Sequence, residues 1–139
     1  MRRPSTSERE FDKELNALEA VFEFLDDTLS GTALDDRGRF VLELAVEELF
    51  TNIVKYGSDL SGRVAVRVTS EPDRVRVDIV DPNTHDFDPT RMPAVDTTRP
   101  IQERKRGGLG LHLVREMADG VEYRYRDREM TVSVTKHLE

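Results

Sequence analysis

Residues Glu43 to Gly57 read ELAVEELFTNIVKYG, and this stretch predicts one long helix around which the rest of the chain is organised. Apolar residues recur at every fourth position and form one stripe, which consists of Val41, Ala45, Leu49 and Ile53. Glu48 and Asn52 lie beside this stripe, also four residues apart, so both side chains leave the helix on one face. The stretch therefore predicts a helix that packs on a core and presents a polar pair at its edge.

The polar pair is suited to a hydrated metal ion. The amide oxygen of Asn52 is a hard ligand of the kind that magnesium prefers. The carboxylate of Glu48 could orient or deprotonate a hydroxyl group beside it. The same pair also fits the solvated face of an ordinary amphipathic helix, and spacing alone leaves both interpretations open.

Composition limits the classes of function. The chain has 139 residues, the size of one domain, and its net charge of −7 argues against nonspecific binding to nucleic acid or to anionic membranes. There is no cysteine, so disulfides and cysteine–zinc sites are excluded. The N-terminal residues lack the apolar segment of a secretory signal, and no apolar run approaches the roughly 20 residues that span a bilayer. We therefore expect a cytoplasmic protein.

The first half of the chain predicts two helices. We expect residues 1–8 to be flexible and residues 9–139 to form a single domain. The first helix runs from about Asp12, as its N-cap, to Leu29, with Gly31 ending it. Its apolar positions are Leu15, Leu18, Val21, Phe22 and Leu25. Asp35 or Asp36 can cap the second helix, which runs to about Tyr56 and stops at Gly57.

Strict alternation then indicates strands. Residues 63–69 and 74–80 alternate valines with polar residues, and Glu71-Pro72-Asp73 forms the turn between them. This hairpin should bury one face and expose an arginine-rich face. Residues 121–125 and 130–135 alternate in the same way, around a turn at 127–129.

The segment between the two hairpins combines a long loop with a short helix. Residues 81–106 hold four of the six prolines and no periodicity, which predicts a functional or disordered loop. Glycines then lead into a helix whose apolar positions are Leu109, Leu113 and Met117, and Gly120 ends it. This order of elements predicts an α+β fold, a two-layer sandwich with a mainly antiparallel sheet and helices on one face.

A basic, glycine-rich segment opens the last helix. Arg106 precedes Gly107, Gly108 and Gly110, and free N–H groups at a helix N-terminus attract phosphate groups. A flexible turn with a solvated basic flank explains the same residues. The segment is not a Walker loop, because no Gly-Lys-Ser/Thr follows, and it is not a Rossmann fingerprint, because no strand precedes it.

Asp81 closes a strand and begins the sequence DPNTHDFDP. A carboxylate at a strand end can accept a hydrogen bond from an exocyclic amine, such as that of adenine. A strand-end turn is the alternative, since Asp, Asn and Pro are common in turns.

Read together, these three segments resemble the anti-sigma factor serine kinases of bacterial partner-switching systems. Those kinases belong to the gyrase, heat-shock protein, histidine-kinase and MutL superfamily of ATPases, which has the Bergerat fold. The residues that match the three family motifs are Glu48 and Asn52; Asp81, Phe87, Asp88 and Pro89; and Gly107, Gly108, Gly110 and Leu111. The second motif departs from the family pattern, because Asn83 replaces a glycine and the spacing to Phe87 is one residue longer. The resemblance covers about residues 15–138.

The resemblance implies a role for each motif, with ATP and Mg²⁺ as cofactors. Asn52 would hold the magnesium ion, Glu48 would be the general base, and Asp81 would bind the adenine amino group. Gly108 and Gly110 would donate backbone N–H groups to the phosphates, and residues 88–106 would form the lid. The remaining residues expected at the nucleotide are Lys55, Asn83, Phe87, Arg106, Gly107, Leu109 and Leu111. Lys55 and Arg106 are candidates for a charge-neutralising cation, although both also fit as solvated charges.

The resemblance also implies partners. The chain would bind a sigma factor and phosphorylate a STAS-type anti-anti-sigma protein on serine or threonine, and it could form a homodimer. A nucleotide-sensing binding module with weak or no phosphotransfer is the alternative, favoured by the Asn83 departure. A catalytic fragment acting on histidine is a third hypothesis, against which stands the lack of a preceding phospho-accepting histidine segment.

Overall fold

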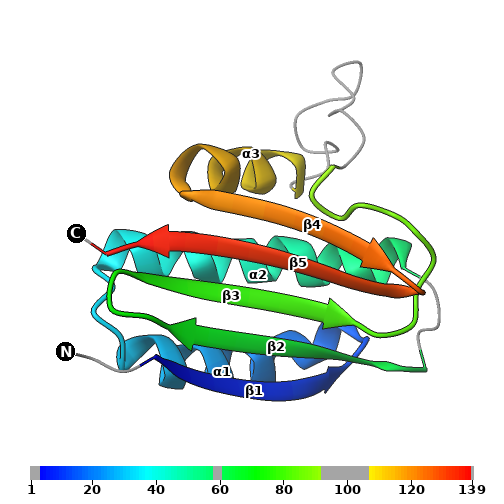
Figure 1. Ribbon diagram of the computed structural model, residues 1–139. Helices are drawn as coiled ribbons and strands as arrows, with labels where there is room; N and C mark the ends of the chain where they lie inside the picture. Colours follow the sequence, from blue (N-terminus) through cyan, green and yellow to red (C-terminus); the bar gives the residue numbers. More distant parts are fainter. Residues whose placement is uncertain (1–3, 58–60, 92–106, 139) are drawn as a thin grey trace.

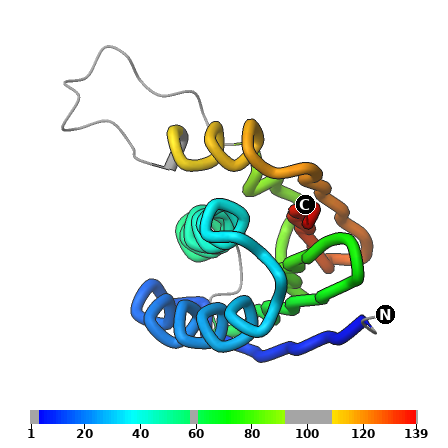
Figure 2. The backbone as a smooth tube through the Cα atoms, turned by 90° about the vertical axis from the view of Figure 1, so that its left-hand side faces the viewer, coloured from blue at the N-terminus to red at the C-terminus, as the bar shows by residue number. Residues whose placement is uncertain are grey.

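The chain folds as one antiparallel sheet covered on one face by helices (Figure 1). This computed structural model describes residues 4–57, 61–91 and 107–138. The sheet consists of β1 (Ser5–Asp12), β2 (Arg63–Ser70), β3 (Arg74–Asp81), β4 (Gly120–Arg126) and β5 (Glu129–His137). These strands have the spatial order β1-β2-β3-β5-β4, and every neighbouring pair is antiparallel. The helices are α1 (Leu18–Ser30), α2 (Asp36–Tyr56) and α3 (Gly107–Met117), and seen from the side α2 lies between α1 and α3 in one helical layer (Figure 2). The α+β, two-layer prediction is confirmed.

The N-terminal residues differ from the prediction. Ser5–Asp12 forms β1, an edge strand that pairs with β2, so the expectation of a flexible segment is wrong for residues 5–8. Along this strand Phe11 is the buried residue and the other side chains are exposed. An edge strand with one buried side chain carries no apolar alternation, which is why the sequence did not indicate it.

The first helix begins later than predicted. Asp12 is the last residue of β1 and pairs with Arg63, so it is not an N-cap. A short 3₁₀ turn, Leu15–Ala17, leads into α1, Leu18–Ser30, and Gly31 ends the helix as expected. Leu15, predicted on the apolar face, lies in the 3₁₀ turn and is exposed.

The central helix α2, Asp36–Tyr56, agrees with the prediction at both ends. The carboxylate of Asp35 accepts a hydrogen bond from the Gly38 N–H at 2.8 Å, which satisfies one of the orphan donors at the helix start. Gly57 is the C-cap, and its N–H donates to the Ile53 carbonyl. The predicted apolar stripe is buried throughout, with exposed fractions of 0–1% at Val41, Ala45, Leu49 and Ile53.

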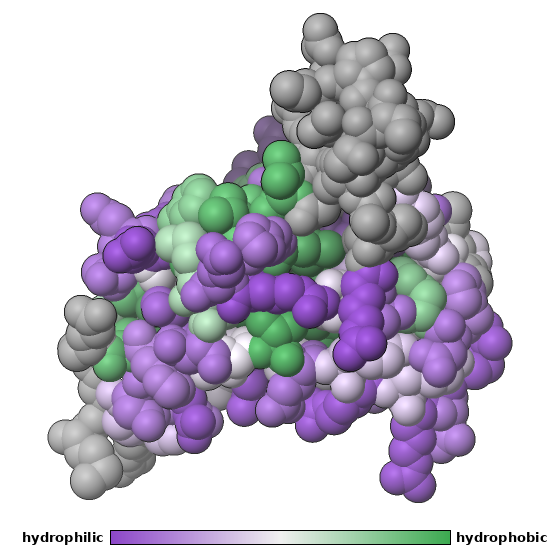
Figure 3. All heavy atoms as spheres, turned by 90° about the horizontal axis from the view of Figure 1, so that it is seen from above, coloured by the Kyte–Doolittle hydropathy of each residue, from purple (hydrophilic) through white to green (hydrophobic). Residues whose placement is uncertain are grey.

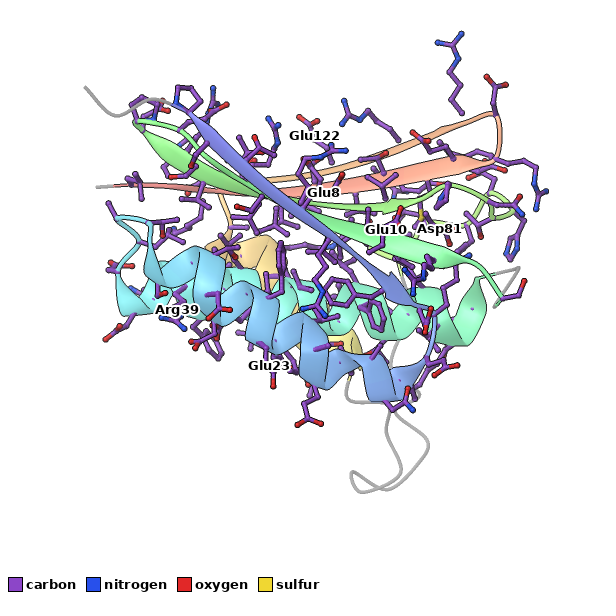
Figure 4. All side chains as sticks on the ribbon, turned by 90° about the horizontal axis from the view of Figure 1, so that it is seen from below. Glu8, Glu10, Glu23, Arg39, Asp81 and Glu122 are labelled. Atoms are coloured by element: carbon purple, nitrogen blue, oxygen red, sulfur yellow. The ribbon has the colours of Figure 1, made fainter. Side chains whose placement is uncertain are left out.

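The first predicted hairpin is confirmed as β2, Arg63–Ser70, and β3, Arg74–Asp81. Five of its valines are buried under the helices, namely Val64, Val66, Val68, Val75 and Val77, whereas Val80 alternates to the opposite face and is half-buried. The opposite face carries charged residues, including Glu8 and Glu122, and none of the helices that the structure describes covers it (Figure 4). On this face Asp78 accepts a hydrogen bond from Ser133 and forms salt bridges with arginines on β2 and β3. These partners stabilise a carboxylate that is only 2% exposed.

The second hairpin consists of β4, Gly120–Arg126, and β5, Glu129–His137. Asp127 and Arg128 join them with φ values of 51° and 68°. Two consecutive residues with positive φ are typical of a type I′ turn, whose twist matches that of the strands. The predicted turn is therefore confirmed.

Helix α3, Gly107–Met117, packs with a different face from the one predicted. Leu109 and Leu113 are 66% and 42% exposed, whereas Leu111 and Val114 are buried. Apolar side chains are accordingly visible among polar ones when the molecule is seen from above (Figure 3). The apolar repeat beginning at Leu109 was the wrong choice, because the close approach of Gly110 to α2 fixes which side of the helix faces inward.

Candidate functional site

Helices α2 and α3 meet at a contact between Glu48 and Gly110. A Cβ atom added to Gly110 would lie 2.2 Å from Oε1 of Glu48, 2.4 Å from its Cδ and 2.7 Å from its Cγ. No side chain fits at these distances, so glycine at position 110 is what allows the glutamate to lie against α3. The structure thus brings together the first and the third of the predicted motifs.

The electrostatic environment of Glu48 favours the protonated form more than water does. Burial raises the pKa of the Glu48 carboxyl above its ordinary value of 4.5, and the nearby Glu47 carboxylate raises it further. The ammonium of Lys55 acts in the opposite direction and lowers this pKa. A carboxylate with a raised pKa is a stronger base, which is a useful property for accepting a hydroxyl proton near neutral pH.

Asn52 lies one turn further along α2 and is only 4% exposed. Its Nδ2 donates a hydrogen bond to the carbonyl oxygen of Pro89 at 3.1 Å, so the first motif is tied to the second. This bond occupies the amide nitrogen and leaves the amide oxygen as the atom that could ligate a metal. Mg²⁺ typically binds through one or two protein ligands plus phosphates and water, so a single amide oxygen is compatible with it. Among the residues that the structure describes, no group of three or more acidic or histidine side chains could hold a metal.

Asp81, labelled in Figure 4, is the last residue of β3. Its side chain is completely buried. Its Oδ1 accepts hydrogen bonds from the Lys13 ammonium at 2.8 Å and from the Asn83 N–H at 3.2 Å. Lys13 was not among the predicted site residues, because the segment around it was assigned to a helix. Phe11 and Lys13 are buried on either side of an exposed Asp12, but the residue types do not reveal this alternation, since lysine is polar.

Asn83 replaces the glycine of the family motif without a left-handed backbone. Among the described residues other than glycine, positive φ values occur at Asp127 and Arg128, and not at Asn83. The Asn83 side chain is exposed, and its Oδ1 accepts a hydrogen bond from Nε of Arg128 at 2.7 Å. The backbone at this position therefore has no left-handed conformation that would require glycine.

Tyrosines of β4 fix the part of the loop that follows Asp81. The hydroxyl of Tyr125 donates to the Thr84 carbonyl at 2.8 Å, and the hydroxyl of Tyr123 donates to Asp86. Burial and the hydrogen bond to Asp86 raise the pKa of Tyr123, so this hydroxyl remains a donor. Neither tyrosine belonged to a recognisable motif, and sequence alone did not place them near the loop.

The Asp88-Pro89 step is an ordered turn. Oδ1 of Asp88 accepts hydrogen bonds from the Thr90 N–H at 2.8 Å and from the Thr90 hydroxyl at 2.6 Å. The guanidinium of Arg115, on α3, donates to the Thr90 carbonyl. This turn therefore connects the second motif to the helix that carries the third.

The remaining predicted residues occupy different places. Phe87 is half-buried and packs against the hydrophobic core, with its ring close to Gly57. Lys55 is exposed one turn beyond Asn52, and Leu111 is buried in the core at 5% exposure. Gly107 begins α3, while Arg106 and the lid residues 92–106 lie outside the described residues.

Comparison with known proteins agrees with this arrangement. Residues 11–136 match the family model described as a histidine kinase-like ATPase domain. The chain belongs to this family. A solved structure of the RsbU and RsbW domains of a Mycobacterium tuberculosis protein superposes on 96% of the chain with a TM-score of 0.66, at 17% identity and over 32% of that protein's chain. That similarity confirms the histidine kinase-like ATPase fold.

Two relatives carry names that specify an activity. Serine-protein kinase RsbW of Halalkalibacterium halodurans is 32% identical over 101 residues, which cover 70% of this chain and 62% of the relative. Serine/threonine-protein kinase BtrW of Bordetella bronchiseptica is 29% identical over 114 residues, which cover 78% of this chain and 80% of the relative. The match thus spans less than two thirds of the Halalkalibacterium kinase.

Within the described residues, no helix is long and apolar enough to cross a membrane.

Proposed function

We propose that this chain is an ATP-dependent protein serine/threonine kinase of the anti-sigma type. Its substrate is a hydroxyl group on a STAS-type anti-anti-sigma protein, and its other partner is a sigma factor that it sequesters. The observation that carries the proposal is the contact of Glu48 with Gly110, which places a carboxylate of raised pKa against the glycine-rich helix α3. The relatives named serine-protein kinases support the same activity.

Each residue of the site has a part in such a transfer. Glu48 accepts the proton of the partner hydroxyl while that oxygen forms a bond to the γ-phosphorus, and the bond from the γ-phosphorus to the β–γ bridging oxygen breaks. Asn52 would hold magnesium through its amide oxygen, and a metal bound there would supply charge neutralisation at the phosphates. The N-terminus of α3 provides N–H donors for the same phosphates. Asp81 accepts a hydrogen bond from the adenine amino group.

The test compares two neighbouring glutamates. Glu48→Gln keeps the shape of the side chain and removes the base, so we expect unchanged nucleotide binding and at least about tenfold slower phosphate transfer to a STAS-domain partner. Glu47→Gln is the matched control, because Glu47 is exposed one residue away on the same helix. Loss of its carboxylate lowers the pKa of Glu48 but leaves the base in place, so transfer at neutral pH should be retained. Transfer at the wild-type rate in Glu48→Gln would remove Glu48 from this role.

A nucleotide-sensing binding module is the second candidate, because Asn83 and the longer spacing depart from the kinase motif. Thermal unfolding with and without Mg²⁺–ATP separates the candidates when it is combined with the transfer assay, since a ligand that binds the native state raises the midpoint. A magnesium-dependent shift without any phosphate transfer by the wild-type protein would favour the binding module. No shift at millimolar nucleotide would exclude both.

A further inference from the structure

A buried ion pair lies at the proposed base-binding end of the site. Lys13 is 2% exposed and Asp81 is 0% exposed, and Nζ of Lys13 lies 2.8 Å from Oδ1 of Asp81. Nζ also donates to the Asn83 carbonyl at 3.4 Å. Lysine is almost never fully buried unless it is paired, so this contact is a specific feature of the site. The proposed phosphate transfer does not use Lys13.

The ion pair determines how Asp81 can form hydrogen bonds. Beside an ammonium, a buried aspartate stays charged, and a charged carboxylate only accepts hydrogen bonds. A carboxylate offers about four acceptor positions, so one group can accept from Lys13, from the Asn83 N–H and from an exocyclic amine together. A purine base that presents a carbonyl oxygen in place of the amine would instead put two hydrogen-bond acceptors, this oxygen and the Asp81 carboxylate, in contact.

We propose that Lys13 is a positioning residue that sets base specificity, because it holds Asp81 as a charged acceptor selective for 6-amino purines. The inference rests on the proposed nucleotide site. It adds Lys13, the residue that follows β1, as a determinant of base specificity at that site. Lys13 remains on Asp81 while the nucleotide is bound. Without it, the buried carboxyl takes up a proton and can donate a hydrogen bond to a 6-oxo purine.

Inosine triphosphate is the matched probe, because it differs from ATP in bearing an oxygen in place of the amino group. Dissociation constants for both nucleotides, with Mg²⁺, would be measured by calorimetry for the wild type, Lys13→Met and Lys13→Arg. We expect the wild type to prefer ATP by at least about tenfold, since a site built for a donor rejects an analogue that lacks it. Lys13→Arg should keep this preference, and Lys13→Met should reduce it to less than about threefold.

Lys136→Met is the control variant. In the wild type, Nζ of Lys136 lies 3.5 Å from Asp119 and donates to the Met117 carbonyl at the end of α3. Lys136 is therefore also a paired lysine, but it is remote from Asp81. The ATP preference of Lys136→Met should equal that of the wild type. Failure of the wild type to bind ATP would overturn the proposed function itself. Wild-type binding with an unchanged ATP preference in folded Lys13→Met would overturn the role of Lys13 alone.

A measurement on the wild-type protein tests whether the Lys13–Asp81 ion pair persists in the nucleotide complex, even if Lys13→Met does not fold. Acetic anhydride acylates accessible amines, and mass spectrometry would report the extent at each lysine with and without Mg²⁺–ADP. Lys55, which is exposed, gives the reactivity of an accessible lysine in the nucleotide-free protein. We expect Lys13 to stay unreactive in both states. Acylation of Lys13 that appears when ADP binds would show that the ammonium leaves Asp81, and would overturn the inference.

Discussion

Replacing Gly110 with alanine should separate catalysis from stability. The added Cβ would lie 2.2 Å from Oε1 of Glu48, whereas ordinary contacts begin near 3.4 Å. The carboxylate oxygen must therefore retreat by about 1 Å, and the side chain must move as a whole, because its Cδ and Cγ are also too close. The helix backbone needs no change, since alanine adopts helical angles more readily than glycine does.

These distances give a magnitude for each effect. A misplacement of about 1 Å in a reacting group can cost roughly 100-fold in rate. In contrast, alanine in a helix interior is favoured over glycine by about 1 kcal/mol, which offsets part of the cost of moving the Glu48 side chain. We therefore expect phosphate transfer to fall by about 100-fold while the melting temperature changes by only a few degrees.

The assay is transfer of labelled γ-phosphate to a STAS-domain partner, with thermal unfolding measured on the same samples. Gly120→Ala is the control, because a Cβ there would meet its nearest atom, in Thr135, at an ordinary 3.7 Å. It should retain full activity. Phosphate transfer by Gly110→Ala at the wild-type rate would refute the reasoning, since it would mean that the position of Glu48 against α3 does not affect catalysis. Loss of nucleotide binding in Gly110→Ala would also contradict it, because the effect would then lie at the phosphates.

Further predictions concern the base, the metal and the loop. Because the pKa of Glu48 is raised, transfer should decline on acidification at a pH above 4.5, and Glu48→Gln should abolish this limb of the pH–rate profile. Asn52→Ala removes the proposed metal ligand, so ATP should no longer raise the melting temperature more in the presence of Mg²⁺ than in its absence; an unchanged magnesium effect would contradict the assignment. Tyr125→Phe removes the hydrogen bond to the Thr84 carbonyl and should lower the free energy of unfolding by about 1 kcal/mol in urea titrations; equal stability would show that water replaces the hydroxyl.

The sequence predicted those elements whose pattern is local. Helix α2 has a stripe that is buried along its length, an aspartate cap and a glycine stop, so its bounds followed from the residues themselves. The hairpin of β2 and β3 followed from the alternation of valines. The order of these helices and strands was enough to predict the fold class. The resemblance to a known family located the three motifs.

The failures have a common physical cause, which is that the deciding contact lies far away in the chain. Strand β1 is stabilised by pairing with β2, and its polar residues carry no signal of their own. The inward face of α3 is selected by the fit of Gly110 against Glu48, which competes with an equally regular repeat through Leu109. Lys13 meets Asp81 only because β1 exists, so an error in one element concealed a residue of the site.

The departure at Asn83 weighs less against kinase activity than the motif comparison suggests. A glycine would be required there if the backbone were left-handed, yet Asn83 is not among the described residues with positive φ. Its N–H donates to Asp81 and its side chain turns outward to Arg128, so the asparagine supports the carboxylate that would bind the base. The extra residue before Phe87 is also accommodated, because Tyr125 and Tyr123 hold the loop at Thr84 and Asp86. The backbone of Asn83 therefore gives no reason to expect a loss of phosphotransfer.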